Sequence, residues 1–231
     1  MKHIITIIQK QLKDTLKNKT VLIQFAMFPL LGVFMVKAVK IEGMPENFFV
    51  MLFTSMYIGM APLTSVSAII SEEKEKNTLR VLMMADVTPW QYLLGIGSYV
   101  FSACMLGGAV FCWLMENVTP YQRLLFLLVM AAGIVASIMM GAAIGVGSRN
   151  QMAATSVSVP MMMVFSFLPM ISMFNDKIEK IARFTYTEQI RVLVGSLGSG
   201  GAYGKNVAII LFNIIVFGVI FSVLYRRQGL V

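Results

Sequence analysis

The chain has 231 residues, of which 58% are hydrophobic and only 13% are charged, with a mean hydropathy of +0.78. Soluble domains are about 45 to 50% apolar and about 25% charged, so this composition excludes a soluble domain, a disordered chain and a purely secreted fold. A net charge of +8 would suit nucleic acid, but the basic residues gather at the ends of apolar runs. That position is typical of a membrane protein, and we expect no nucleic-acid partner.

An amphipathic segment opens the chain, over residues 1–19. Its apolar residues recur near the helical period of 3.6 residues, with lysines between them: Ile4, Ile5, Ile8, Leu12 and Leu16. This pattern predicts a helix that lies on the membrane surface. A helix docked on a protein partner is the alternative, since basic amphipathic helices serve both purposes.

Six uncharged apolar runs follow, each close to the roughly 20 residues that cross a bilayer. They cover residues 20–36, 48–70, 90–115, 124–148, 152–174 and 206–225. We therefore predict an all-α membrane protein that forms a single domain over residues 1–231, with six transmembrane helices surrounded by membrane lipid. Six spans leave both termini on one side. The excess of Lys and Arg on that side predicts cytoplasmic termini in the plasma membrane.

The middle of these runs contains no Asp, Glu, Lys, Arg or His. Ion-driven carriers generally need such a group at membrane depth, so the sequence predicts that energy for transport comes from outside the chain. The side chains left for a substrate path are hydroxyls, an amide and adaptable methionines, for which core filling is the alternative. The predicted path consists of Thr54, Ser55, Met56, Thr155, Ser158, Met162 and Asn213.

Small residues recur every fourth position in the fourth run, at Gly133, Ser137, Gly141 and Gly145. A stripe of this kind lets two helix backbones approach closely, so we predict a role in helix packing.

The connection over residues 175–205 combines mixed charge with a glycine-rich end, and we expect short extracellular helices there. Its end approaches the nucleotide-binding pattern G-x-x-x-x-G-K-[ST]. Two defining positions differ, because Ser199 replaces the first glycine and Asn206 replaces the last hydroxyl. We therefore predict no cofactor in this chain.

The sequence contains no recognisable catalytic motif either. Glu72 and Glu73 are paired as in intramembrane CAAX-type proteases, but Asn77 stands at the arginine position of that pattern. The only histidine, His3, precedes every span, so neither a metal site nor an enzyme is expected.

The densest run of charges joins the second and third spans, over residues 71–88. Leu79, Leu82 and Met83 form a short apolar face at helical spacing, and Thr88-Pro89 marks the start of the next helix. The pattern predicts a short cytoplasmic helix that is charged on one side and apolar on the other. A solvated linker helix without further function is the alternative.

This segment resembles the signature of ABC-2 type transporter permeases, in which a charged run leads into G-T-L, several apolar residues and a proline. The matching stretches are Glu75-Lys76-Asn77-Thr78-Leu79, Val81-Leu82-Met83-Met84, Thr88-Pro89 and Tyr92-Leu93-Leu94-Gly95. Two departures are Asn77 at the usual glycine, although Asn tolerates left-handed backbone angles, and Ile96-Gly97 where a lysine is common. The amphipathic N-terminus, the six spans and the long last connection also resemble the family.

The resemblance implies the membrane subunit of an ATP-driven exporter, whose separate ABC ATPase subunits bind ATP and Mg. Residues 71–88 would be the coupling helix that those subunits push. The resemblance gives positioning contacts to Glu72, Glu73, Glu75 and Arg80, and an apolar plug to Leu79 and Leu82, with Thr78 and Met83 completing the coupling site.

Six spans are few for a translocation path, so we expect a second permease copy, identical or related. The methionine-rich spans and the lack of a large outer domain favour a hydrophobic or amphipathic cargo, such as a peptide, a bacteriocin or a drug. The alternatives are a non-transporting membrane scaffold or immunity protein, and an ion-driven carrier.

Overall fold

The computed structural model describes residues 2–17, 19–39, 43, 45–78, 88–197 and 203–227. All regular structure in these residues is helical, which confirms the predicted fold class. The helices are α1 (Lys2–Lys17), α2 (Lys19–Ala38), α3 (Phe48–Glu75), α5 (Pro89–Leu114), α6 (Pro120–Gly147), α7 (Gln151–Ser172), α8 (Asp176–Ala182), α9 (Tyr186–Gly195) and α10 (Gly204–Arg227).

In the described residues, five helices are long and apolar enough to cross a membrane: α3, α5, α6, α7 and α10. They correspond to the second through sixth predicted spans. The apolar part described for α2, Leu22–Ala38, is shorter. The six-span arrangement therefore stays a prediction, while a membrane protein with several spans is supported.

Capping boxes set the starts of two of these helices. Thr88 precedes α5 and Thr119 precedes α6, and each forms a reciprocal capping box with a glutamine three residues later. Each threonine is followed by a proline, which suits the first helical turn because its missing N–H has no partner there anyway. These Thr-Pro pairs fix where the chain re-enters the bundle.

The end of α3 lies five residues beyond the predicted boundary at residue 70. The stretch from Ser71 to Glu75 contains no glycine or proline, so nothing interrupts the helix. The helix ends where Asn77 adopts a left-handed conformation with φ of 56°. Asn77 thus takes the backbone role that glycine commonly fills at a helix end. As a result, Glu72 and Glu73 lie at the C-terminal end of a long helix and not at the start of a short one.

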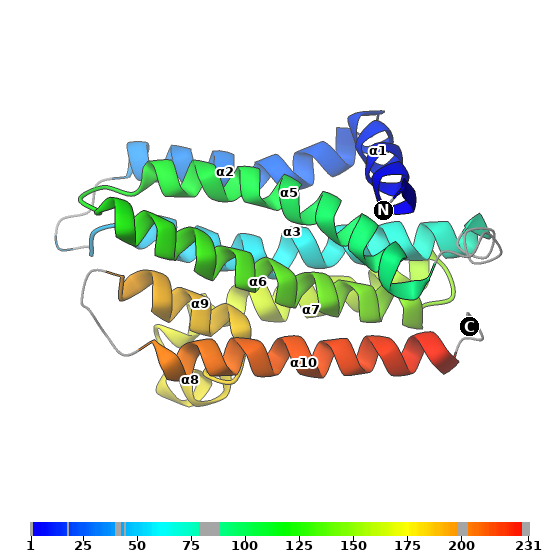
Figure 1. Cartoon of the computed structure of the whole chain (residues 1–231). Coiled ribbons are helices and arrows are strands. Elements are labelled where there is room, and N and C mark those ends of the chain that lie inside the picture. The colour runs from blue at the N-terminus through cyan, green and yellow to red at the C-terminus, as the bar shows by residue number, and fades with distance from the viewer. Residues whose placement is uncertain are drawn as a thin grey trace.

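α3 runs through the centre of the bundle and contacts α2, α5, α6, α7 and α9 (Figure 1). α1 crosses one end of the bundle, and the last turn of α10 lies toward that same end (Figure 1). We call this the α1 end, and the opposite end, which holds α9, the α9 end.

The small-residue stripe of α6 faces α3. A methyl group added to Gly141 would lie 2.4 Å from the carbonyl oxygen of Leu63, and one added to Gly145 would lie 3.0 Å from that of Ser67. The hydroxyl of Ser137 donates to the carbonyl of Ile58 at 2.6 Å. The atoms around Gly141 belong to the backbone of Leu63, which cannot swing aside, and a methyl group on Gly145 would also lie 2.8 Å from the Cβ of Ile70. Gly133 instead faces the side chains of Ile58 on α3 and Ile190 on α9. Ser137, Gly141 and Gly145 therefore set the distance between α3 and α6.

The connection after α7 contains two short helices, α8 and α9. α9 packs against α3, α6, α7 and α10, and the residues from Tyr186 to Ile190 are buried. The connection therefore contains short helices, as its sequence predicted, and α9 folds back into the bundle. Its apolar side, formed by Ile190, Leu193 and Val194, explains this burial.

Candidate functional site

Four consecutive charged residues end α3, and each one has a different partner. The first, Glu72, forms an exposed ion pair with Lys76 at 2.5 Å, one turn along the chain. Exposed pairs of this kind contribute little to stability. The next three residues instead reach other helices, and they make this end of α3 a junction.

Glu73 is the centre of the junction. Its side chain is 8% exposed, and its carboxylate accepts hydrogen bonds from Lys10 at 2.5 Å and from Gln11 at 2.9 Å, both on α1. The hydroxyl of Tyr92 on α5 donates to the other oxygen at 2.5 Å. Three donors compensate the loss of water around this carboxylate. Glu73 therefore holds α1 and α5 to the end of α3.

Lys74 and Glu75 reach the turn between α6 and α7. Lys74 donates to the carbonyls of Val146 and Ser148 at 2.8 and 2.7 Å, where the last carbonyls of α6 lack helical partners. Glu75 accepts a hydrogen bond from the backbone N–H of Gln151 at 2.9 Å, in the first turn of α7. Each charge has the sign that the neighbouring helix dipole favours. We call residues 72–75 and these partners the α3 junction.

The structure describes only part of the predicted coupling site. The side chain of Glu73 points into the protein and contacts α1 and α5, and its role in coupling stays a prediction. Its partners Lys10 and Tyr92 are distant in sequence, which is why the local pattern did not reveal this contact. Thr78 is the last described residue after the turn at Asn77, and its role in the coupling site stays a prediction. Leu79, Arg80, Leu82 and Met83 lie outside the described residues, and their roles stay predictions.

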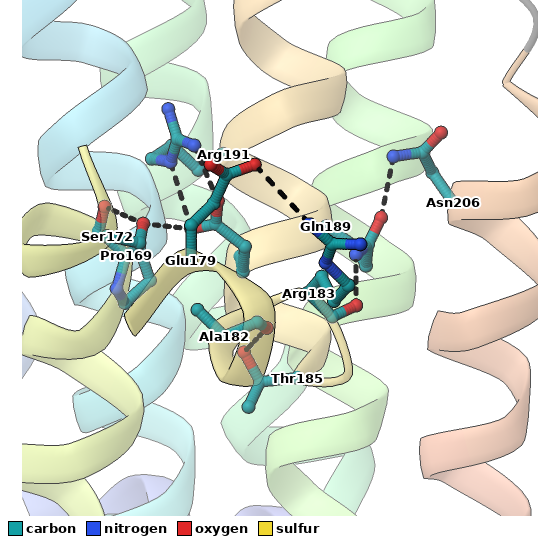
Figure 2. Close-up of polar contacts among 10 residues, drawn as sticks. Pro169, Ser172, Glu179, Ala182, Arg183, Thr185, Gln189, Arg191 and Asn206 are labelled. Carbon is teal, nitrogen blue, oxygen red and sulfur yellow. Dashed lines mark hydrogen bonds and ion pairs between the residues drawn. The ribbon is translucent and has the colours of Figure 1, made fainter. Parts of the chain in front are cut away.

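A second buried carboxylate, Glu188 on α9, lies toward the α9 end. Arg191 binds both of its oxygens, at 3.0 and 2.5 Å, and Ser172 at the end of α7 donates to it at 2.9 Å. Nearby, Asn206 on α10 donates to the side chain of Gln189 at 2.6 Å (Figure 2). These contacts tie α9 to α7 and α10. Sequence reasoning missed them, although acidic and basic residues three positions apart beside an apolar helix face were visible.

The start of α9 also contacts the middle of α6. The hydroxyl of Tyr186 lies 2.7 Å from that of Ser137, whose own hydrogen is available to Ile58. Burial raises the pKa of Tyr186 above its ordinary value, so the phenol stays neutral and donates to Ser137. The small-residue stripe of α6 thus contacts both α9 and α3.

The sequence matches the family model described as ABC-2 family transporter protein over residues 2–225, from α1 to the last turn of α10. The chain belongs to the ABC-2 transporter family. The predicted family is therefore confirmed. Permeases of this family are membrane components of transporters, work with ABC ATPase subunits and are not themselves catalytic. None of the curated proteins compared with the chain matches it.

The residues of the predicted substrate path lie in several places in this ABC-2 permease, and their role stays a prediction. Thr54, Ser55 and Met56 are buried within the bundle on α3. Thr155 is exposed on α7, and its hydroxyl donates to its own helix at 2.9 Å. Asn213 on α10 donates to the carbonyl of Phe184 at 3.0 Å and so holds the turn before α9.

The two remaining path residues lie on α7, where Ser158 is buried and Met162 is half-buried. The predicted residues thus divide between the interior and the open face of α7. In the described part of this ABC-2 permease, no group of three or more His, Cys, Asp or Glu residues is placed to hold a metal ion.

Proposed function

We propose that this chain is the permease subunit of an exporter driven by separate ABC ATPase subunits, with the α1 end in the cytoplasm. Membership of the ABC-2 family supports a partner of that kind. The distribution of Lys and Arg supports the orientation. In this proposal the ATPase pushes on residues 76–88, which join α3 to α5.

The α3 junction is the observation that carries the proposal. A push on residues 76–88 acts on the ends of α3 and α5, which Glu73 and Tyr92 join directly. Lys10 adds α1 to this unit, and Lys74 adds the turn after α6. Displacement at one loop is therefore shared by several helices, as rigid-body rocking requires.

A second permease copy completes the transport path in this proposal. α7 has an open face that holds both polar and adaptable side chains, since Thr155, Met161 and Met163 are exposed there. Two such faces opposite each other would enclose a pathway with few charges. That surface suits a hydrophobic or amphipathic substrate such as a peptide, a bacteriocin or a drug.

The proposal is tested by ATP-driven transport in inverted membrane vesicles that contain the permease and its ATPase. We expect Leu79→Asp to reduce ATP-driven uptake of substrate into these vesicles at least ten-fold while the permease remains in the membrane. Tyr121→Asp is the matched control, because it adds a carboxylate at an exposed site at the α9 end. Normal transport by the Leu79 variant, or transport that needs a proton gradient and no ATP, would contradict the proposal.

A further inference from the structure

Two apolar grooves meet at Trp90, in the first turn of α5. One lies against α10 between Arg226 and Ile215 and has a volume of about 450 Å³. The other follows α5 from Trp90 to Ser102 beside α6 and has a volume of about 430 Å³. The indole of Trp90 is half exposed and packs edge-on against Phe221, with 5.9 Å between ring centroids. Trp90 thus belongs to both grooves.

Each groove is about as deep as one leaflet of a bilayer. Residues 215–226 of α10 rise about 16 Å, and residues 90–102 of α5 rise about 18 Å, at about 1.5 Å per residue. Half of a hydrocarbon core of about 30 Å is about 15 Å. Both grooves start at the α1 end, where α10 finishes with two arginines. They therefore extend from the membrane surface toward its middle.

The walls of the grooves suit hydrocarbon. The hydroxyl of Ser102 donates to the carbonyl of Ser98 at 2.8 Å, and that of Ser222 donates to Gly218 at 2.9 Å. These hydroxyls are bonded to their own helices and leave apolar atoms toward the groove. A methyl group added to Gly218 would meet no atom within 4 Å, so the floor of the α10 groove is open there.

The entrance of the grooves is positively charged. Arg226 lines the α10 groove and is exposed, and it forms no ion pair with any carboxylate of the described residues. The positive end of the α5 dipole lies at the same level, because α5 begins at Pro89. Tryptophan and arginine are common at this depth of a membrane protein.

We propose that the two grooves bind an anionic phospholipid from the leaflet at the α1 end. Its phosphate binds Arg226, and its two acyl chains lie on either side of Trp90. Charge complementarity at the entrance and the one-leaflet depth of both grooves identify this occupant. The site is separate from the α3 junction and does not depend on the direction of transport.

Quenching of Trp90 fluorescence by brominated acyl chains tests the proposal. The 231 residues include two tryptophans, so Trp113→Phe leaves Trp90 as the single reporter. The protein is reconstituted in mixtures of phosphatidylglycerol and phosphatidylcholine, with bromine on one lipid at a time. We expect phosphatidylglycerol to be preferred about five-fold at Trp90, the effect of one basic side chain at an anionic surface.

Three variants locate the effect. Arg226→Gln should abolish the preference, whereas Arg227→Gln, with the same charge change one residue away and outside the groove, should keep it. Gly218→Leu fills the groove and should reduce quenching by both lipids. Equal quenching by the two lipids, an equal loss in both arginine variants, or unchanged quenching in the Gly218 variant would overturn the proposal. Quenching by neither lipid would also overturn it, since it would mean that protein covers this face.

Discussion

Among the residues that the structure describes, each end of the bundle buries one carboxylate, and the two carboxylates have different partners. Glu73 at the α1 end binds side chains from two other helices, which lie 63 and 19 residues away in sequence. Glu188 at the α9 end is held mainly by Arg191, three residues along its own helix. The α1 end is therefore a junction between distant elements, whereas the buried carboxylate of the α9 end is paired within its own helix.

This difference has a mechanical consequence. Separating α1 or α5 from α3 would break a buried hydrogen bond to Glu73. Moving α9 against α6 would leave the Glu188–Arg191 pair intact and would break single contacts such as that between Tyr186 and Ser137. We therefore expect the α1 end to move as one body and the α9 end to be the part that can rearrange.

The largest effect is expected at the α9 end. Arg191→Met leaves the buried Glu188 carboxylate without its cation and should lower the free energy of unfolding by about 3 to 5 kcal/mol. Replacing both residues, with Glu188→Leu and Arg191→Met, should recover most of this loss, because no unpaired charge remains. Thermal unfolding of the purified variants in detergent measures both effects. If the double variant is as unstable as Arg191→Met alone, Glu188 and Arg191 must also stabilise the protein through contacts outside the pair.

The junction at the α1 end should be somewhat less costly to break, because Lys10 is half exposed. Glu73→Ala removes the shared acceptor of three donors and should destabilise the protein by about 2 to 3 kcal/mol. Glu72→Ala is the matched control and should stay within about 0.5 kcal/mol, since its ion pair is exposed. Denaturant titrations measure the free energy of unfolding of both variants. If the two variants lose the same amount, Glu73 is no more important to stability than an exposed carboxylate.

The close contact between α3 and α6, at the small residues of α6, connects the two ends of the bundle. Gly141→Ala places a methyl group against the Leu63 carbonyl and should cost about 1 to 3 kcal/mol through displacement of the helices. Gly204→Ala is the control, because no atom lies within 4 Å of the added methyl group. Urea unfolding in mixed micelles compares them. If Gly141→Ala does not lower the free energy of unfolding, the α3–α6 contact can accommodate a methyl group. The two ends of the bundle would then be coupled only weakly through it.

Sequence reasoning predicted what depends on local pattern. Thr88-Pro89 marked the start of α5, and the small residues of the fourth run were recognised before the structure placed them against α3. Asn77 was recognised as able to adopt left-handed angles, and it does.

The missed features depend on contacts between distant residues. Nothing near Glu73 in sequence indicates that Lys10 and Tyr92 will surround it. Short helices were expected in the α9 segment, but its mixed charge did not indicate burial, because the mutual neutralisation of Glu188 and Arg191 requires the folded helix. The long connection therefore looked more polar than it is after folding.

A pair of distances measured by electron paramagnetic resonance tests the central claim most directly. Spin labels at exposed Lys13 on α1 and Leu94 on α5 report the α1 end, and labels at Lys13 and Val192 on α9 report across the bundle. In the complex with its ATPase, we predict that ATP binding leaves the Lys13–Leu94 distance unchanged and changes the Lys13–Val192 distance. A Lys13–Leu94 distance that changes as much as the other would contradict the account, because the α1 end would then not move as one body.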